Sequence, residues 1–259
     1  MSKQQNAVMA EIRRKELLEL LNAEGHATVA MLCNYFKVSP ATIRNDLNDL
    51  EAMRQLKRTH GGAISMQSLP ELTSREKTGL RAADKRSIAQ KAMEYVRPGQ
   101  VIAIDTGTTT IEMASLLGNM QDVTVITNDL KIASLLEENC SLNVIFLGGI
   151  VRKNFHCTVG DSVLRQIDEL NIDTLFLATN SMDIRCGLST PSIETADVKR
   201  RLISKAARCI LLADSSKVGM KSLACFADID MIDILITDKG VDEGFANEVQ
   251  ARGVEIIRA

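Results

Sequence analysis

Residues 38–51 read VSPATIRNDLNDLE, a stretch that predicts a helix with a well-defined first turn. Ser39 can accept a hydrogen bond from a backbone amide of that turn, and Pro40 stands at the first helical position, where its missing N–H costs nothing. Three apolar residues then recur at helical spacing: Ile43, Leu47 and Leu50. Such a stripe predicts that one face of the helix is buried while the opposite, polar face meets solvent.

Two more helices and a hairpin surround this stretch. Apolar residues recur at helical spacing over residues 8–21, in a helix expected to end near Gly25, and a shorter helix capped by its first residue fits Thr28 to Phe36. After the quoted stretch, residues 56–64 read as a short β-hairpin whose paired glycines supply the positive φ of a tight turn. Three helices followed by a hairpin predict a winged helix-turn-helix in residues 1–65.

The exposed start of the central helix has the chemistry of a DNA-contacting surface. The major groove admits short polar side chains near a helix N-terminus, and phosphates attract Lys and Arg. The residues expected to contact DNA are Ser39, Ala41, Thr42, Arg44 and Asn45 on the helix, and Lys57, Arg58 and His60 in the hairpin. Of these, Thr42, Arg44 or Asn45 could read base edges. Taken alone, the same pattern also fits the solvated surface of an unrelated three-helix module.

The quoted stretch, together with LKRTHGGA at residues 56–63, resembles the signature of the DeoR family of bacterial regulators. That signature runs approximately V-S-x-x-T-I-R-R-D-L-x-x-L-E-x-x-G-x-L-x-R-x-H-G-G-A. Asn45 replaces its second Arg, which removes a cation and offers a side chain suited to adenine, so a different operator preference is expected. Arg54 replaces a Gly that would end the helix in the left-handed region. We therefore expect either backbone strain of about 1 kcal/mol at Arg54 or a different helix exit.

The rest of the chain alternates between apolar runs and helical patterns. A polar segment around Pro70, residues 66–80, is expected to be a linker. Strands are expected at residues 101–105, 123–127, 144–148, 174–178, 209–213, 234–237 and 254–257, and helices at residues 84–96, 109–117, 129–138, 161–171, 193–207 and 242–252. Several strands lack polar alternation, as is typical of sheets covered on both faces. Residues 81–259 are therefore expected to form an α/β domain with a mainly parallel sheet.

Three loops of this domain could bind a phosphorylated sugar, because ligands of parallel sheets bind beyond the carboxyl ends of the strands. The first loop opens a helix and offers hydroxyls and amides to a phosphate; its residues are Asp105, Thr106, Gly107, Thr108, Thr109 and Thr110. The second loop holds Asn128 and Asp129. The third loop, residues 214–219, holds Lys217 as a cation. Each loop alone also fits ordinary helix capping, whereas acidic groups beside an anion loop suit a polyol phosphate.

This half also resembles the DeoR-family sensor domain, whose fold is similar to that of ribose-phosphate isomerases. The matching pieces are residues 104–109, Thr127-Asn128, Gly148-Gly149, Gly187-Leu188, Glu194, Lys199 and residues 212–217. The resemblance implies that residues 105–110 and Lys217 hold a phosphate. It further implies that sugar hydroxyls are bound by Asp129, Asp183 and Glu194, within an effector site that includes Gly148 and Gly149. Ser181 departs from the family's usual Gly and could narrow the pocket near Asp183.

Composition limits the class of protein. The 259 residues are 45% hydrophobic and 25% charged, as in ordinary globular proteins, and no apolar run reaches the length of a membrane helix. A cytoplasmic protein with no membrane partner is therefore expected. Net charge is −2, although residues 1–65 hold nine Lys and Arg against seven Asp and Glu. The cysteines, Cys33, Cys140, Cys157, Cys186, Cys209 and Cys225, form no C-x-x-C pair. Reduced, mostly buried thiols are expected, with neither a metal site nor a cofactor.

The leading hypothesis is a DNA-binding transcriptional regulator, most simply a repressor of a carbohydrate-utilisation operon. It would bind a double-stranded operator as a homo-oligomer, a dimer or a tetramer, and a phosphorylated sugar would change the placement of its DNA-binding modules. One alternative is a sugar-phosphate isomerase with an appended DNA-binding module, in which Asp105, Asp183 or Glu194 could nominally act as the base. Another is an architectural DNA-binding protein with a vestigial sensor. No residue is singled out as catalytic.

Overall fold

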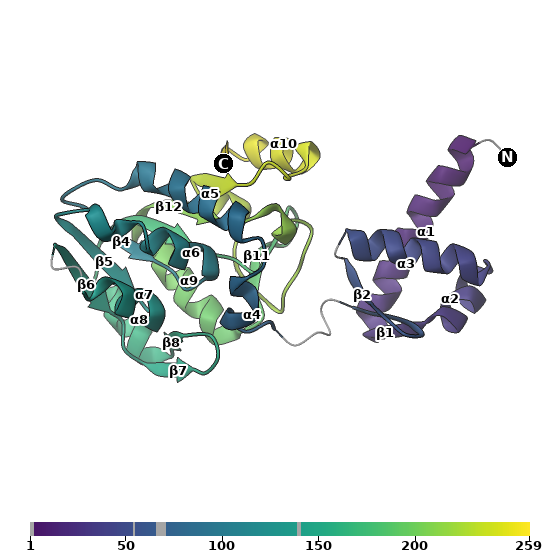
Figure 1. Ribbon diagram of the computed structural model, residues 1–259, viewed down its shortest axis with the longest axis horizontal. Coiled ribbons are helices and arrows are strands. Elements are labelled where there is room, and N and C mark those ends of the chain that lie inside the picture. The colour runs from purple at the N-terminus through teal and green to yellow at the C-terminus, as the bar shows by residue number, and fades with distance from the viewer. Residues whose placement is uncertain (1–2, 54, 66–70, 139–140) are drawn as a thin grey trace. The chain divides into compact units, whose positions relative to one another are not determined.

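A computed structural model of the chain describes residues 3–53, 55–65, 71–138 and 141–259. The chain divides into two compact units, Met1–Glu71 and Leu72–Ala259. Each unit has its own hydrophobic core, and Figure 1 shows the elements of both. We refer to them as the N-terminal unit and the C-terminal unit and describe each by itself.

The N-terminal unit is a three-helix module with a small sheet. Its elements are α1 (Lys3–Glu24), β1 (His26–Thr28), α2 (Val29–Phe36), α3 (Pro40–Ala52), β2 (Leu56–Thr59) and β3 (Gly62–Ser65). Both predicted caps are confirmed, because Thr28 Oγ1 accepts a hydrogen bond from Met31 N and Ser39 Oγ accepts one from Thr42 N, each at 3.2 Å. α1 is longer than predicted, and the left-handed Gly25 (φ +77°) follows its last residue, near the expected end.

The hairpin carries a third strand that the sequence pattern does not predict. β1 pairs antiparallel with β3, which gives the order β1-β3-β2. Gly62 accommodates this pairing, since a Cβ at that position would lie 2.0 Å from Ala27 O. The buried stripe of α3 joins Leu17, Leu21, Leu32 and Leu56 in one core. The winged helix-turn-helix arrangement is thereby confirmed.

The end of α3 bears on one sequence expectation. α3 ends at Ala52, and Met53 follows with φ −79° and ψ 0°, a conformation that any residue can adopt. The backbone is therefore not in the left-handed region at the end of α3 or at Met53. Arg54, where strain or a different exit is expected, lies outside the described residues.

Seven parallel strands form the central sheet of the C-terminal unit. They are β4 (Val101–Ile104), β5 (Val123–Thr127), β6 (Leu142–Phe146), β9 (Ile172–Leu177), β12 (Ala206–Leu212), β14 (Ile234–Thr237) and β15 (Glu255–Arg258). Their order is β15-β14-β12-β9-β4-β5-β6, and every neighbouring pair is parallel. The mainly parallel sheet is therefore confirmed, with all seven predicted strands in it.

Helices cover both faces of this sheet (Figure 1). One face packs against α5 (Ala82–Ala92), α6 (Thr108–Ala114) and α7 (Leu130–Leu136), and the other against α8 (Asp161–Asp168), α9 (Ile193–Lys205) and α10 (Glu243–Ala251). Successive strand residues point to opposite faces, so Ile102 and Ile104 enter the first core and Ala103 the second. Two buried cores explain why these strands are apolar at nearly every position.

The C-terminal unit also contains short strands and 3-10 turns outside the central sheet. They are the hairpin of β7 (Ile150–Arg152) and β8 (Cys157–Val159), the antiparallel sheet of β10 (Ser181–Asp183), β11 (Gly187–Thr190) and β13 (Ala224–Ala227), and 3-10 turns at Met93–Tyr95, Leu117–Asn119, Ser215–Lys217 and Ile229–Met231. In the part of the chain that is described, no helix combines the length and apolarity needed to cross a bilayer.

The predicted linker requires a correction. Within residues 66–80, the first five lie outside the described residues, whereas Ser74–Thr78 form a helix, α4, that belongs to the C-terminal unit. A capping box stabilises this short helix. Thr73 Oγ1 accepts a hydrogen bond from Glu76 N at 3.3 Å, and Glu76 Oε2 accepts one from Thr73 N at 2.8 Å.

The expectation of mostly buried thiols is only partly right. Cys157 and Cys209 are buried, and burial raises the pKa of the Cys157 thiol to about 11. Cys186 and Cys225 are exposed, because the first stands in the turn between β10 and β11 and the second points outward from β13. All five cysteines of the described residues are free thiols.

Candidate functional site

The first turns of α3 present the expected DNA-contacting side chains to solvent. Ser39, Ala41, Arg44 and Asn45 are exposed and Thr42 is half-buried. The Ser39 and Thr42 hydroxyls lie 2.9 Å apart, so the cap also orders the polar end of the helix. The apolar stripe behind these residues is buried, which fixes the face that α3 turns outward.

A buried carboxylate that the sequence pattern does not single out fixes α3 against α1. Asp46 is 3% exposed and receives three hydrogen bonds. Arg13 donates from Nε at 2.6 Å and from Nη2 at 3.2 Å, and Arg14 Nε donates at 3.2 Å. Both Asp46 oxygens are thereby used. An acidic residue beside the apolar stripe of a helix is the signal that could have identified this contact.

The hairpin side chains divide into two groups. Lys57 and His60 are exposed and available to a partner. Arg58 is instead held against α3, since its Nη1 donates to the Asn48 side chain and its backbone N–H donates to Glu51 Oε1 at 2.8 Å. Arg58 therefore fastens the wing to the helix, a role that the expected phosphate contact did not include.

In the C-terminal unit, the strand order reverses between β4 and β9. The chain continues from β4 to β5 and β6 on one side, and then crosses to β9 and onward to β15 on the other. Loops diverge at such a switch point, and ligands of doubly wound sheets bind in the resulting crevice. The predicted loop of residues 105–110 leaves β4 at this point.

The switch point contains a buried ion pair. Asp105 and Lys199 are 0% and 2% exposed, and the Lys199 ammonium donates to Asp105 Oδ2 and, at 2.9 Å, to the backbone oxygen of Ala178. Ala178 N donates to the same Oδ2 at 2.9 Å. Asp105 Oδ1 is buried and accepts no hydrogen bond from any residue that the structure describes. An unsatisfied buried carboxylate oxygen is costly, so it marks a position that favours a hydroxyl or amide donor.

The neighbouring loop after β5 is connected to this position. Asp129 caps α7, with Oδ1 accepting hydrogen bonds from Lys131 N at 2.8 Å and Ile132 N at 3.1 Å, while Oδ2 accepts one from the Thr106 hydroxyl at 2.7 Å. Burial raises the pKa of Asp129, and these hydrogen bonds oppose the rise. The first two predicted loops are thus joined through Thr106.

Asn128 supplies a second unsatisfied oxygen. Its side chain is 1% exposed, and its Nδ2 donates to Thr158 O at 2.8 Å. Its Oδ1 has no donor among the described residues. Asn128 and Asp105 follow adjacent parallel strands, so the two oxygens belong to the same edge of the sheet.

The other residues of the first loop are closely packed. A Cβ on Gly107 would lie 2.7 Å from the Ala178 Cβ, so glycine allows the loop to approach β9. Thr109 and Thr110 are buried, and Thr110 Oγ1 donates to Gly107 O at 2.8 Å; Thr108 is half-buried at the start of α6. Because α6 has only seven residues, most of the attraction for an anion must come from side chains.

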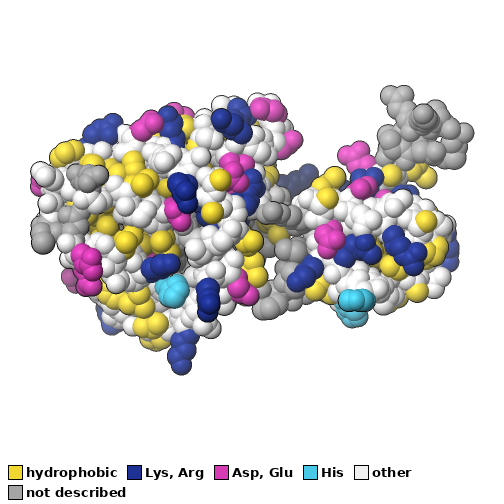
Figure 2. Space-filling model, viewed as in Figure 1, with side chains coloured by type: hydrophobic (Ala, Val, Ile, Leu, Met, Phe, Trp, Pro, Cys, Tyr) yellow, Lys and Arg dark blue, Asp and Glu magenta, His cyan; other side chains and the backbone are white. Residues whose placement is uncertain are grey.

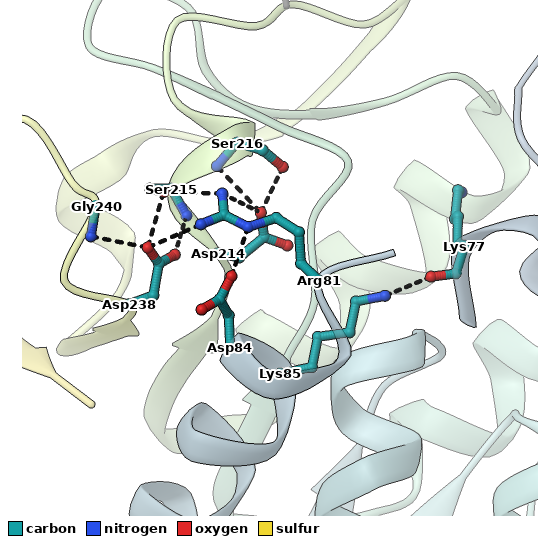
Figure 3. Close-up of polar contacts among 9 residues, drawn as sticks. All are labelled: Lys77, Arg81, Asp84, Lys85, Asp214, Ser215, Ser216, Asp238 and Gly240. Atoms are coloured by element: carbon teal, nitrogen blue, oxygen red, sulfur yellow. Dashed lines mark hydrogen bonds and ion pairs between the residues drawn. The ribbon is translucent and has the colours of Figure 1, made fainter. Parts of the chain in front are cut away.

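Lys217 ends the 3-10 turn Ser215–Lys217, in a loop that Arg81 organises. Figure 3 shows the contacts of Arg81 with this loop. The Arg81 guanidinium donates to Asp84 at 2.6 Å, Asp214 at 3.3 Å and Asp238 at 3.0 Å, and it also donates to the Ser215 hydroxyl. Arg81 thereby ties the start of α5 to the loops after β12 and β14. The left-handed conformation of Arg81 (φ +52°) has a local cost that these contacts offset.

A second lysine, Lys85, interacts electrostatically with Lys217. Lys85 on α5 is 5% exposed and donates from Nζ to Lys77 O (Figure 3). Burial lowers the pKa of Lys85, and the positive charge of Lys217 adds to that lowering while Asp214 opposes it. Two neighbouring ammonium groups attract an anion more strongly than Lys217 alone. Sequence reasoning missed Lys85 and Arg81, because neither stands in a recognisable loop motif.

The remaining predicted residues lie in separate settings. Gly148 accepts hydrogen bonds at its carbonyl from the Gln166 and Ser162 side chains, and a Cβ on Gly149 would lie 2.7 Å from Val159 O, so close packing requires glycine at position 149 only. Asp183 Oδ1 accepts hydrogen bonds from the Arg185 and Cys186 amides in the β10–β11 turn. Glu194 is exposed in the first turn of α9. Among the described residues, no hydrogen bond or ion pair joins Asp183 or Glu194 to the first loop, and their role stays a prediction.

Two protein families match the chain. Residues 13–69 match the DeoR-like helix-turn-helix domain, and residues 80–239 match the DeoR C-terminal sensor domain. Among solved structures, a D-ribose-5-phosphate isomerase in complex with phospho-erythronic acid is 18% identical, with a TM-score of 0.39 over 52% of each chain.

Full-length relatives are also similar to the chain. The HTH-type transcriptional regulator GlpR of Haloferax volcanii is 35% identical over 246 residues, which cover 95% of this chain and 96% of that protein. A putative aga operon transcriptional repressor of Escherichia coli O157:H7 is 34% identical over 248 residues, which cover 95% of this chain and 92% of that protein. Both relatives are named as regulators, so the isomerase alternative is not supported. Family matches in both units and identity along nearly the whole length show that the chain belongs to the DeoR family of transcriptional regulators.

Proposed function

We propose that the chain is a repressor of a carbohydrate-utilisation operon whose DNA binding is modulated by a phosphorylated sugar. The observation that carries the effector proposal is the pair of buried, unsatisfied oxygens, Asp105 Oδ1 and Asn128 Oδ1. Both stand at the carboxyl edge of the sheet, and each can accept a hydrogen bond from a sugar hydroxyl. A polyol would supply two such donors.

The phosphate of the sugar would be held by the neighbouring cations. The positive charge of Lys217 contributes to lowering the pKa of the largely buried Lys85, and Arg81 holds the loop of Lys217 in place. A phosphate between the two ammonium groups would relieve their mutual repulsion. The hydroxyls of Thr106 and Thr108 lie in the same loop as Asp105 and can complete the contact.

The N-terminal unit would bind the operator through α3 and the wing. A homo-oligomer would place two such units on half-sites one helical turn apart. The sugar can release the DNA only if it binds more tightly to the arrangement that does not fit the operator, because equal affinity for both arrangements changes nothing. The relative named as a putative aga operon transcriptional repressor supports this sign of regulation.

The experiment that tests the proposal measures operator affinity with and without a panel of sugar phosphates. We expect Lys217→Ala to keep the operator affinity of the wild type and to lose its response to the effector. Lys91→Ala is the matched control, since this half-buried lysine pairs with Glu94 near the other end of α5 from Lys85. Operator affinity that no sugar phosphate changes in the wild type, or a full response in Lys217→Ala, would contradict the proposal.

A further inference from the structure

A polar pocket lies beside the proposed effector site and is not used by it. Its volume is about 490 Å³, and its lining residues are Thr73, Arg75, Thr78, Gly79, Lys131, Asn154 and His156. Three of these side chains carry or can acquire a positive charge, and no Asp or Glu is among the described lining residues. Figure 2 shows Lys and Arg side chains gathered around a histidine on the C-terminal unit. Such a lining favours an anion.

One wall of the pocket is α4, which is docked on the turn between β7 and β8. Ser74 N donates to Asn154 O at 3.1 Å, and the Lys77 ammonium lies 5.7 Å from the centre of the Phe155 ring. The only carboxylate of α4, Glu76, caps the helix by hydrogen bonding with Thr73, which is itself a lining residue, and this bonding lowers the pKa of Glu76. Arg75 is the charged side chain of α4 that lines the pocket.

The opposite wall is shared with the proposed sugar-binding loop. Lys131 N donates to Asp129 Oδ1, the carboxylate that also accepts the Thr106 hydrogen bond. Leu130 N donates to His156 O at 2.7 Å. Burial raises the pKa of Asp129, and the charge of His156 is one of the smaller effects that lower it. His156 itself stands in the left-handed region (φ +58°) and Asn154 does too (φ +71°), so the turn is held in a conformation with a local energetic cost. A ligand that reaches Asp129 thus adjoins the pocket.

We propose that Arg75, Lys131 and His156 bind a second anionic group of the effector, so that the effector is a sugar carrying two anionic groups. One anion would lie at Lys85 and Lys217, the sugar hydroxyls would meet Asp105 and Asn128, and the second anion would enter the pocket. This inference rests on the proposed function. Its ligand chemistry is a phosphate or a carboxylate, because Arg binds either in a bidentate manner and a histidine N–H can donate to either.

The position of α4 gives this second anion a regulatory consequence. α4 is the first helix of the C-terminal unit after the segment that comes from the N-terminal unit. An anion in the pocket contacts Arg75 together with Lys131 and His156 only when α4 is docked. Binding of the anion would therefore favour the docked position of α4. The effector's second charge would thereby reach the segment leading to the DNA-binding unit.

Calorimetric titration of the full chain with matched ligand pairs tests the inference. The pairs are fructose 6-phosphate with fructose 1,6-bisphosphate and glucose 6-phosphate with glucose 1,6-bisphosphate, and 6-phosphogluconate supplies a carboxylate as the second anion. We expect at least one doubly anionic compound to bind ten times more tightly than its monophosphate. In Arg75→Gln and His156→Gln we expect that advantage to fall below threefold, with monophosphate affinity unchanged.

Lys153→Gln is the control, because this exposed lysine stands in the same turn but does not line the pocket. Tighter binding of 6-phosphogluconate than of the bisphosphates would identify the second group as a carboxylate. Tighter binding of a bisphosphate would identify it as a phosphate. The inference is overturned if no doubly anionic compound exceeds its monophosphate, or if Arg75→Gln and Lys153→Gln weaken it equally. If only the monophosphates bind, the inference fails and the proposed function is still supported. If no sugar phosphate binds, the result contradicts both the inference and the proposed function.

Discussion

Each unit of the molecule contains a buried aspartate paired with a cation, and the two pairs differ in how completely they are satisfied. Asp46 receives three hydrogen bonds from Arg13 and Arg14, which use both of its oxygens. Asp105 receives hydrogen bonds from Lys199 and Ala178 N at one oxygen, while the other has no donor among the described residues. The first pair is complete within the protein, and the second is not.

This difference separates a structural ion pair from a ligand-binding one. A carboxylate with both oxygens used can position two helices but has little left to offer a partner. A buried oxygen without a donor destabilises the protein until a ligand supplies a hydrogen-bond donor, and this penalty favours the binding of a hydroxyl. We therefore expect substitutions at Asp46 to affect DNA binding through α3, and substitutions around Asp105 to affect the effector.

The largest effect is expected when the Asp105 pair is broken. Lys199→Met leaves a buried carboxylate without its cation, and such a loss destabilises proteins by about 3–5 kcal/mol. The double variant Lys199→Met/Asp105→Leu removes both charges and should recover most of that loss, without recovering the response to the effector. Urea unfolding of the C-terminal unit measures both values. A loss below about 1 kcal/mol in the single variant would show that the pair is not truly buried.

A smaller effect is expected at Asp46. In Asp46→Asn the arginines are left with a weaker acceptor, but Arg13 and Arg14 are 18% and 29% exposed and can recover hydration. We expect a loss of about 1–2 kcal/mol in unfolding of the N-terminal unit, together with weaker operator binding. Asp49→Asn is the control, because Asp49 also pairs with Arg14 but is 49% exposed. An equal effect of both variants would remove the distinction drawn for Asp46.

The smallest effect is expected at Asp129. Burial raises the pKa of this carboxyl in the folded protein, so its ionised form reduces folding stability above that pKa, and the penalty disappears as the pH falls through it. Asp129→Asn removes the penalty and keeps an oxygen for the Lys131 and Ile132 amides. At pH 7 the variant should match or exceed the wild type, within about 1 kcal/mol, and this advantage should shrink as the pH falls through the raised pKa of Asp129 toward the ordinary pKa of an aspartate. Urea unfolding over a series of pH values checks the trend, and a clear loss of stability at pH 7 would contradict it.

The elements of the fold follow from local patterns where burial is uniform. Apolar runs such as residues 234–237 predict buried parallel strands, and β14 has those bounds. β1 is not predicted, because three residues are too few to show a period and its pairing with β3 is non-local. α4 is not predicted for another reason. The Thr73–Glu76 capping box is present in the sequence, but Pro70 and the polar composition around it indicate a linker.

The site is predictable in part. The loop at Asp105 and the loop at Asn128 are recognisable because each follows a strand and opens a helix. The partner of Asp105 lies 94 residues away on α9, and Arg81 contacts acidic residues more than 130 positions away. Pairings across such distances depend on the strand order, which the sequence pattern alone does not determine. The unsatisfied oxygens, which distinguish a ligand site from a cap, appear only when every donor has been placed.

Ligand-induced stabilisation tests the central claim most directly. The melting of the wild-type C-terminal unit is measured with a panel of phosphorylated sugars, and the measurement is repeated with Asn128→Ala and with Asp46→Asn. At 100 times its dissociation constant, an effector adds about 2.7 kcal/mol of stability. We predict this gain in the wild type and in Asp46→Asn, and its loss in Asn128→Ala. An undiminished gain in Asn128→Ala, or no gain with any sugar phosphate in the wild type, would contradict the assignment of the unsatisfied oxygens to the effector.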